Sequence, residues 1–371
     1  MGILIYSAHM FTHFRHRAAG FAELLSTPLP IESYLRLIDP LWSATSIPAR
    51  VEAVIPETKR AATIVLKPGA KWQGHKAGQW IGVGVDIQGV RHRRCYSITS
   101  VPSDKSGRIS ITVQAIPGGL VSNFLVNNIG FGDIIYLDPP SGEFTLPDRE
   151  KPNFLFVTGG SGITPVMGML RTMEAAGEIG DVVLLHHAPN AEESIFSGEL
   201  SDMARRFSTL IIVEVYTGPG VPSPEHAITN VRLDQLCPDW RTRSAWSCGP
   251  APLLASIEKA WKKEGIEAKL NVERFRPAMT SGVGASQGGR VRFTTSDIET
   301  VADGRTPLLE VAESSGLLPA SGCRMGICHS CDCRLVSGTV RDIRDGRIQS
   351  DPGDRVQICV SVAAGDVELE V

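Results

Sequence analysis

Hydrophobic and polar positions follow two different patterns along most of the chain. Between residues 46 and 148, apolar and polar residues alternate in six short stretches that end at Gly, Pro, Asp or Asn, such as AATIVLKPG and GRISITVQAI. This period of two is typical of half-buried strands, and six such strands predict an antiparallel barrel. Between residues 149 and 275, apolar strands such as NFLFVTGG and VVLLHHA alternate with helical stretches such as PVMGMLRTMEAAG. That alternation predicts a parallel sheet covered by helices.

Composition changes in the other segments. Residues 1–45 carry two short amphipathic stretches divided by Thr-Pro-Leu-Pro, which predicts a helical N-terminal extension outside any core. Residues 276–289 are rich in Gly and Ser and have almost no apolar bulk, so we expect a flexible linker. Residues 290–371 contain 13 Asp and Glu, 9 Arg and no Lys, which leaves a net charge of −4. The predicted fold class is multidomain, α+β and α/β.

The composition of the whole chain limits its class and its partners. With 371 residues, the chain is long enough for two or three domains of about 100–150 residues. A net charge of −3 gives no general attraction to nucleic acid or to an anionic membrane. No signal peptide is recognisable, and no apolar run approaches the roughly 18 residues that span a bilayer. We therefore expect a cytoplasmic monomer with no nucleic-acid partner and no membrane span.

A group of cysteines near the C-terminus carries the strongest chemical signal. In SGCRMGICHSC the thiols are separated by four and then two residues, and another thiol follows in QICVSV. This is the plant-type pattern for a [2Fe-2S] cluster, and the small residues between the thiols let backbone N–H groups approach the sulfurs. A structural zinc site and disulfides are the alternatives, although zinc sites usually come as two CxxC pairs. Cys333 is predicted to pack in the core. The predicted cluster ligands are Cys323, Cys328, Cys331 and Cys359.

Longer stretches resemble known families. The last segment, from TPLLEVAESSGLLPASGCRMGICHSCDCRL to CVSVAAGDVELEV, resembles plant-type ferredoxins, whose fold is a β-grasp. The two segments before the linker resemble the ferredoxin–NADP⁺ reductase superfamily. Together they resemble a one-chain reductase, which implies five parts. These are an N-terminal extension (1–45), an FAD-binding barrel (46–148), an NAD(P)-binding domain (149–275), a linker (276–289) and a [2Fe-2S] ferredoxin domain (290–371).

Two motifs in the barrel segment predict a flavin site. In RRCYSITS, Arg94 and Tyr96 share one face of a strand, so a guanidinium for a phosphate lies beside a ring that can stack on a flavin. The resemblance implies that Ser97 hydrogen-bonds the flavin near N5. PGGLVSNFLVNN resembles the superfamily's Gly-x-x-Ser segment, which opens a helix whose N-terminus can receive the flavin pyrophosphate. The resemblance therefore implies FAD, with FMN as the alternative. The donors assigned in this second motif are Gly119, Leu120, Val121 and Ser122.

Three further motifs predict a nicotinamide site. VTGGSGITPVMGMLR follows a predicted strand and resembles the superfamily's Gly-Gly-x-Gly-x-x-Pro turn. SCGP ends a later strand, and the resemblance implies that Cys248 and Gly249 lie against the nicotinamide and that Cys248 positions hydride transfer, with core packing as the alternative. In NVERFRP, Phe275 is predicted to shield the flavin or to be part of the core. The residues predicted to bind the nucleotide at the Gly-rich turn are Gly159, Gly160, Gly162, Thr164 and Pro165.

The preferred nicotinamide coenzyme is left open by these motifs. A 2′-phosphate usually needs an arginine near the end of the second parallel strand, and HHAPNAEESIF offers none before Arg205 and Arg206. The residues favour NADH, whereas the resemblance implies NADPH. We place NADPH ahead on the resemblance alone.

The combination of cofactors predicts an oxidoreductase. NAD(P)H delivers a hydride, a ferredoxin cluster accepts single electrons, and FAD can do both, so FAD is expected between them. LLSTPLPIESYLRLIDPLWS resembles the leader of bacterial reductases that serve membrane-bound diiron acyl desaturases, which implies a role in fatty acid desaturation and a peripheral place at the membrane through this partner. The alternatives are the reductase component of an aromatic-ring or alkane oxygenase and, from another class, an NAD(P)H-binding redox sensor.

Overall fold

The computed structural model describes residues 38–102, 104–147, 153–218, 229–275 and 287–371. Residues 1–37 of the predicted N-terminal extension and nearly all of the predicted linker lie outside these ranges. Among the described residues, no helix is both long enough and apolar enough to cross a membrane.

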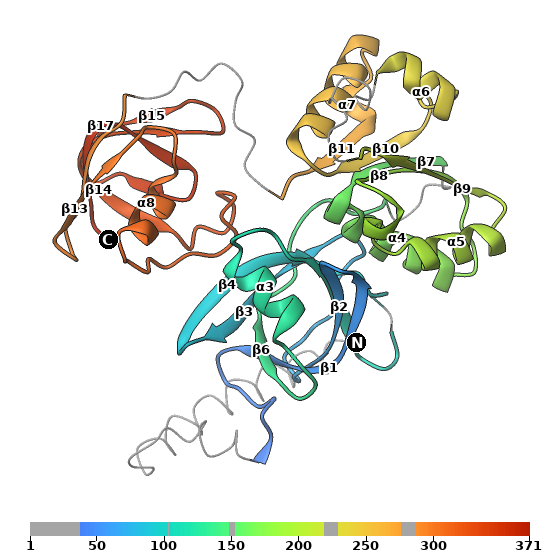
Figure 1. The fold of residues 1–371 in the computed structure, drawn as a ribbon, viewed down its shortest axis with the longest axis horizontal. Helices are drawn as coiled ribbons and strands as arrows, with labels where there is room; N and C mark the ends of the chain where they lie inside the picture. Colours follow the sequence, from blue (N-terminus) through green and yellow to red (C-terminus); the bar gives the residue numbers. More distant parts are fainter. Residues whose placement is uncertain (1–37, 103, 148–152, 219–228, 276–286) are drawn as a thin grey trace, which may run out of the picture.

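The first described domain is an antiparallel barrel (Figure 1). Its strands lie in the order β4-β3-β6-β1-β2-β5. The sheet closes where the chain after β4 meets β5, because Thr99 N–H donates to Ser110 O at 2.8 Å. Ile64, Ile81 and Ile111 fill the interior. The barrel expected from the alternation is thus confirmed. The elements are β1 (Ile47–Thr58), β2 (Ala61–Pro68), β3 (Trp80–Ile87), β4 (Val90–Ser97), β5 (Ile109–Gln114), α3 (Leu120–Asn127) and β6 (Ile134–Leu137).

The second domain is a five-stranded parallel sheet in the order β11-β10-β7-β8-β9. Helices α4 and α5 pack on one face and α6 and α7 on the other, because successive strand residues such as Phe156 and Val157 belong to different cores. The parallel sheet is confirmed, and β11 is a strand that the sequence pattern did not predict. The elements are β7 (Asn153–Gly159), α4 (Ile163–Ala175), β8 (Asp181–Ala188), α5 (Ser197–Arg206), β9 (Leu210–Tyr216), α6 (Asn230–Leu236), β10 (Ser244–Cys248), α7 (Ala251–Glu264) and β11 (Leu270–Glu273).

The C-terminal domain has the expected β-grasp arrangement, a mixed sheet in the order β13-β12-β17-β14-β15 with one helix packed on it. Strands β12 and β17 are parallel and the other pairs are antiparallel. Cys333 is buried in this core, as predicted for a packing residue. The elements are β12 (Gly289–Phe293), β13 (Ile298–Ala302), α8 (Leu308–Ser314), β14 (Asp332–Asp342), β15 (Ile348–Gln349), β16 (Arg355–Gln357) and β17 (Ser361–Leu369).

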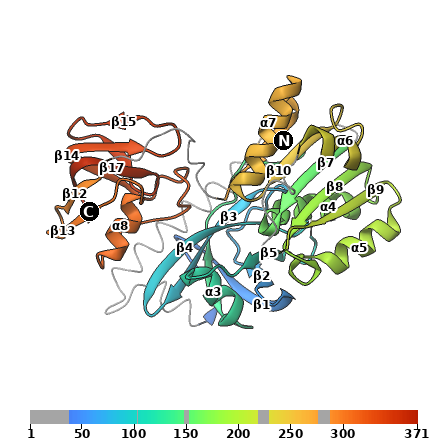
Figure 2. The same cartoon turned by 45° about the horizontal axis from the view of Figure 1, so that its top comes forward.

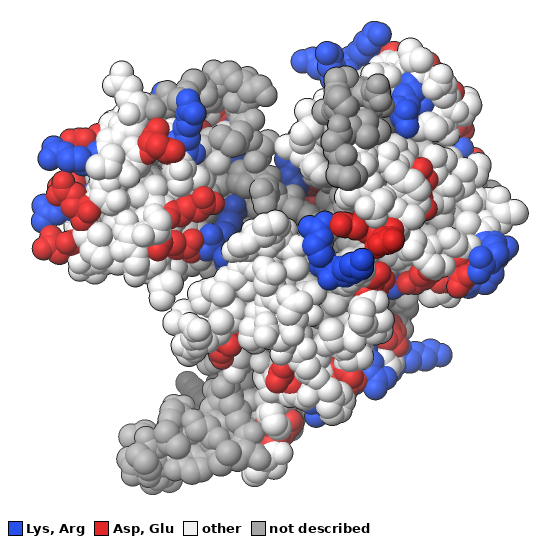
Figure 3. Space-filling model, in the orientation of Figure 1, with Lys and Arg blue, Asp and Glu red and all other residues white. Residues whose placement is uncertain are grey.

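The barrel lies between the other two domains, and β4 is on the side that faces the C-terminal domain (Figure 2). Asp and Glu side chains lie across the visible face of the C-terminal domain, with Arg side chains among them (Figure 3).

Candidate functional site

The four predicted cluster cysteines come together in two pairs. Cys323 N–H donates to Cys328 Sγ at 3.2 Å, and the Cys331 and Cys359 thiols are hydrogen-bonded to each other. Three of the thiols are buried, whereas Cys328 is exposed. Within the described ranges, no three His, Cys, Asp or Glu side chains gather at a single-ion site. Two pairs of thiols suit a cluster in which two irons share four thiolates.

Backbone N–H groups of the cluster loop point at the sulfur of Cys323. The amides of Met325, Ile327 and Cys328 donate to this sulfur at 3.3, 3.4 and 3.4 Å. Such a set of amides stabilises a thiolate and therefore fits an anionic cluster. The hydrogen bond from the Cys359 thiol similarly lowers the pKa of Cys331 to about 7.

Two glycines are required for this loop to close. Gly326 has φ +71°, and a Cβ there would overlap the Arg344 guanidinium and lie 2.9 Å from Val360 Cγ2. A Cβ on Gly322 would lie 2.7 Å from Cys328 Sγ. Any larger residue at either position would displace the loop from the thiols.

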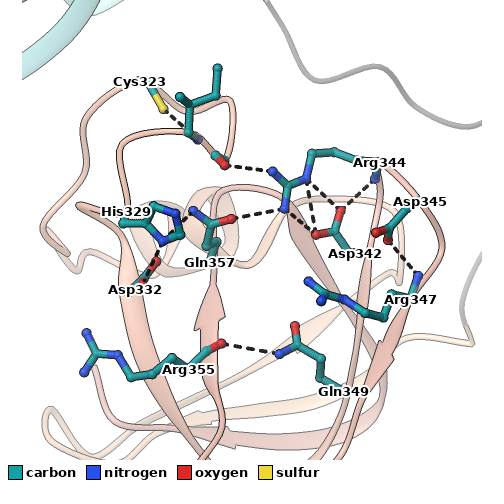
Figure 4. A network of polar contacts seen from close by, with 12 residues as sticks. Cys323, His329, Asp332, Asp342, Arg344, Asp345, Arg347, Gln349, Arg355 and Gln357 are labelled. Atoms are coloured by element: carbon teal, nitrogen blue, oxygen red, sulfur yellow. Dashed lines mark hydrogen bonds and ion pairs between the residues drawn. The ribbon is translucent and has the colours of Figure 1, made fainter. Parts of the chain in front are cut away.

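Arg344 supports the cluster loop from behind, and the sequence analysis missed it (Figure 4). Its guanidinium donates to Gly326 O at 2.7 Å, to Asp342 Oδ2 at 2.7 Å and to Gln357 Oε1 at 3.1 Å. Burial alone would raise the pKa of Asp342, but the hydrogen bonds and charge of Arg344 lower it. The only signal in the sequence was the Arg/Asp alternation of RDIRDGR, which is also common in exposed turns.

The three predicted flavin residues lie near the end of β4, which pairs with β3. In this pairing Arg94 lies opposite Val83 and Ser97 lies opposite Trp80. Ser97 Oγ is buried and has no hydrogen-bond partner among the described residues, which fits a contact with a bound ligand. Burial lowers the pKa of Arg94, with a further contribution from the charge of Arg324, and it raises the pKa of the Tyr96 phenol. A half-buried guanidinium beside a partly buried ring fits the phosphate and isoalloxazine of a flavin.

The other predicted flavin segment forms the start of α3. Gly119 is the N-cap residue, and a Cβ there would lie 2.5 Å from Ile116 Cγ1 and from Ser122 Oγ. Ser122 Oγ accepts a hydrogen bond from Ile116 N–H at 3.3 Å, while Leu120 is half exposed and Val121 is buried. Because α3 contacts both β4 and β5, the two predicted flavin segments lie in one part of the barrel.

The Gly-rich turn after β7 packs directly against the turn after β10. A Cβ on Gly159 would lie 2.8 Å from Pro250 Cδ, and a Cβ on Gly249 would lie 3.0 Å from Gly159 N. A Cβ on Gly162 would overlap Cys248 O. These glycines bring the two predicted parts of the nicotinamide site into contact.

The other predicted nucleotide-binding residues of the Gly-rich turn are Gly160, Thr164 and Pro165. Gly160 has φ +53°, which favours glycine, and Pro165 is buried in the first turn of α4. The Thr164 hydroxyl donates to Ser161 O at 2.8 Å, so its hydrogen is used within the turn and its predicted role as a donor to the nucleotide would require this bond to break.

Cys248 lies opposite Glu273 in the pairing of β10 with β11. Cys248 is fully buried, and burial followed by the charge of Glu273 raises the pKa of its thiol. Burial also raises the pKa of Glu273 to about 8, and its Oε2 has no hydrogen-bond partner among the described residues. The sequence analysis used NVERFRP only for Phe275, which is 38% exposed and therefore not a core residue. Glu273 is a titratable group beside Cys248 that it missed.

Comparison with known families accounts for all three parts. Family models match residues 51–146 (oxidoreductase FAD-binding domain), 156–259 (oxidoreductase NAD-binding domain) and 293–364 (2Fe-2S iron-sulfur cluster binding domain). An NADPH oxidoreductase from Mycobacterium tuberculosis is 40% identical over 359 residues, which cover 96% of this chain and 92% of the relative. The chain belongs to the ferredoxin–NADP⁺ reductase superfamily, with a [2Fe-2S] domain.

Other relatives of this reductase agree with that assignment. A glycine betaine monooxygenase reductase subunit from Pseudomonas aeruginosa is 30% identical and matches 80% of this chain and 87% of its own length. The solved structure of phthalate dioxygenase reductase superposes with a TM-score of 0.63 at 21% identity, covering 88% of this chain and 98% of that one, and it shows the shared fold. The reductase is thus an NAD(P)H-dependent oxidoreductase with FAD and [2Fe-2S] domains, which confirms the prediction of an enzyme.

The cluster loop of the reductase faces the flavin strand. A small pocket between the two domains is lined by Arg94 and Cys95 of β4 and by Cys323, Cys328 and Ser330 of the cluster loop. Burial raises the pKa of Cys95, and the nearby thiols of Cys323 and Cys328 raise it further. Since Tyr96 and Ser97 follow Cys95 directly, the predicted flavin residues lie on the same strand as the residues that line this pocket with the predicted cluster ligands.

Proposed function

We propose that this reductase supplies electrons to a membrane-bound fatty-acyl desaturase. The observation that carries the proposal is the N-terminal extension, whose sequence resembles the leader of desaturase reductases. The M. tuberculosis oxidoreductase matches 96% of the chain and so includes most of the N-terminal extension, whereas the monooxygenase reductase subunit matches only 80%. Residues 1–37 lie outside the described ranges, so the support comes from their sequence.

The chemistry of the described sites suits such an acceptor. Bound FAD accepts a hydride and passes on single electrons, and a [2Fe-2S] cluster carries one electron at a time. A diiron desaturase needs two electrons that arrive singly. Within the chain, Cys248 and Glu273 would position the nicotinamide, and Arg94, Tyr96 and Ser97 would hold the flavin. The four predicted cluster cysteines would hold the cluster from which electrons pass to the partner.

The charge of the C-terminal domain also supports a basic partner. Residues 290–371 carry a net charge of −4, and the carboxylates lie across the visible face of the domain (Figure 3). Opposite charges on two partners increase their association rate more than their final affinity. A desaturase with a basic cytoplasmic face would therefore be reduced faster at low ionic strength.

Reconstitution tests the proposal. Membranes that contain a co-expressed desaturase should convert saturated acyl chains when the purified reductase and NAD(P)H are added, and turnover should fall as salt is raised. The Cys331→Ser reductase, which is expected to lose its iron, is the matched control and should support no conversion. If the native reductase gives no more desaturation than this control, the desaturase assignment is wrong.

The second candidate function is reduction of an oxygenase. It is supported by the relative named as a glycine betaine monooxygenase reductase subunit, which is 30% identical over 319 residues. The same reconstitution, with an aromatic-ring or alkane oxygenase component in place of the membranes, distinguishes the two. Product formation with the oxygenase alone would favour this second function.

A further inference from the structure

The order of the strands determines how a bound dinucleotide would lie along the carboxyl edge of the parallel sheet. Cys248 ends β10, the Gly159–Gly162 turn follows β7, and β8 and β9 come next in the sheet. A dinucleotide with its nicotinamide at Cys248 and its pyrophosphate at the Gly-rich turn must extend its adenosine towards the ends of β8 and β9. This step rests on the function proposed above, because it takes NAD(P)H as the electron donor.

The ends of β8 and β9 carry carboxylates. Glu214 on β9 pairs in register with His186 on β8, and its two oxygens accept hydrogen bonds from Ser194 Oγ at 2.5 Å and from Tyr216 OH at 2.6 Å. Glu192 and Glu193 follow β8 in a short 3₁₀ turn. Three carboxylates thus lie around the adenosine end of the site, two on the connection after β8 and one on β9.

Cations are missing from this part of the sequence. There is no Lys or Arg between Ala188 and Ala204 or between Phe207 and Val231. Arg205 and Arg206 end α5, the helix that leads back to the start of β9, so they lie at the opposite, amino edge of the sheet. They also pair there with Asp202 and Glu174.

The next arginine, Arg232, is also at the amino edge. Two residues earlier, Asn230 Nδ2 donates to Glu264 Oε1. Glu264 is the last residue of α7, the helix that begins at the carboxyl edge after β10 and ends at the amino edge before β11. The start of α6, including Arg232, therefore lies at the end of the sheet remote from the Gly-rich turn.

Two cations reach η2 (Ala191–Glu193) from the barrel, and both are paired. Lys59 Nζ lies 3.6 Å from Glu192 Oε2, and the Arg60 guanidinium pairs with Glu193. These two ion pairs balance the charges of Glu192 and Glu193, so the negative charge of Glu214 is the one left unbalanced. A 2′-phosphate would therefore meet carboxylates, and the cations near it would have to leave their partners.

We propose that the reductase selects NADH over NADPH, because the carboxylate of Glu214 repels a 2′-phosphate while Lys59 and Arg60 are already held by Glu192 and Glu193. This differs from the NADPH preference implied by the resemblance. It agrees with the interpretation drawn from the residues of HHAPNAEESIF alone.

Equilibrium binding to the holoenzyme tests the proposal independently of turnover. Calorimetry at low ionic strength should give a Kd for NAD⁺ at least tenfold below that for NADP⁺, and kcat/KM should favour NADH by the same factor. Added salt should narrow the difference in Kd, because it screens the repulsion of the phosphate. A Kd for NADP⁺ equal to or below that for NAD⁺ would overturn the proposal.

Two charge-reversal variants test whether the discrimination against NADP⁺ arises at the adenosine end of the site. Glu192→Arg should tighten NADP⁺ binding at least fivefold and leave NAD⁺ binding nearly unchanged. Glu178→Arg makes the same change of charge on an exposed residue before β8, at the amino edge, and should change neither Kd. Equal effects of the two variants would overturn the assignment to the adenosine end. Failure to oxidise either nucleotide would overturn the donor function itself and this inference with it.

Discussion

Cys248 and Glu273 lie opposite each other at the ends of the parallel strands β10 and β11, with the thiol fully buried and one carboxylate oxygen buried without a described partner. The two residues are far apart in sequence and become neighbours only through the pairing of β10 with the short strand β11. Their chemistry leads to the first prediction.

Hydride transfer should depend on the ionisation of Glu273. Its pKa is raised to about 8 by burial, so the carboxylate forms as the pH passes through 8. A negative charge beside the nicotinamide stabilises the positive charge that develops as hydride leaves, so the rate of flavin reduction should rise across this range. Stopped-flow measurements should show the inflection in the native protein and no inflection in Glu273→Gln.

Thermal stability provides an independent check of the same group. In the unfolded chain this carboxyl ionises near its ordinary value of 4.5, whereas the folded protein keeps the proton up to about pH 8. Because the folded state binds the proton more tightly, stability should fall as the pH rises from about 4.5 to 8. Glu273→Gln should flatten this part of the Tm profile, and an unchanged slope would contradict the raised pKa.

Serine substitutions should separate the cluster ligands from the packing cysteine. Cys323→Ser, Cys328→Ser, Cys331→Ser and Cys359→Ser should each abolish the [2Fe-2S] absorbance and the bound iron. Cys333→Ser is the matched control, since its thiol lies in the core of the same domain. It should keep the iron and lose about 1–3 kcal/mol of stability from burying a hydroxyl. Loss of iron in Cys333→Ser would show that the ligands are misassigned.

Arg344 should raise the reduction potential of the cluster. The Arg344 guanidinium lies beside the cluster loop and donates a hydrogen bond to Gly326 O. Loss of this positive charge would disfavour the reduced cluster, which is more negative than the oxidised one. Arg344→Met should therefore lower the potential in a redox titration and speed the loss of iron. Arg347→Met removes the same charge at an exposed position and should change neither quantity appreciably. Equal shifts in both variants would contradict a specific role for Arg344.

Ser97 should act on the flavin and contribute little to folding. Its hydroxyl is buried without a described protein partner, so Ser97→Ala should slow flavin reduction by at least about tenfold with no loss of thermal stability. Ser110 is the contrasting barrel hydroxyl, because its Oγ is hydrogen-bonded to Thr99 Oγ1 at 2.8 Å. Ser110→Ala should cost about 1 kcal/mol and leave the rate unchanged. The reverse pattern would place the flavin contact elsewhere.

Much of the fold could be predicted because its signals are local. The alternation of apolar and polar residues in AATIVLKPG and GRISITVQAI corresponds to β2 and β5, because successive side chains of a strand point to opposite faces. In β5 the polar residues Ser110 and Thr112 are buried as well as the apolar ones. The cluster loop is equally local: its first three ligands lie within nine residues, and their spacing is set by the geometry of one loop. Strand β11 was missed because it has only four residues, none of them fully buried, so its pattern is too short and weak.

The rest was decided by the tertiary structure, because it depends on which strands and helix ends become neighbours. Arg344 reaches Gly326 only through the turn that follows β14, and Glu273 reaches Cys248 only through a parallel register. The sequence shows that Arg205 and Arg206 follow β8, but only the direction of α5 puts them at the far edge from the adenosine. Periodicity and spacing report the element to which a residue belongs, whereas contacts between elements depend on how the strands and helices pack within each domain.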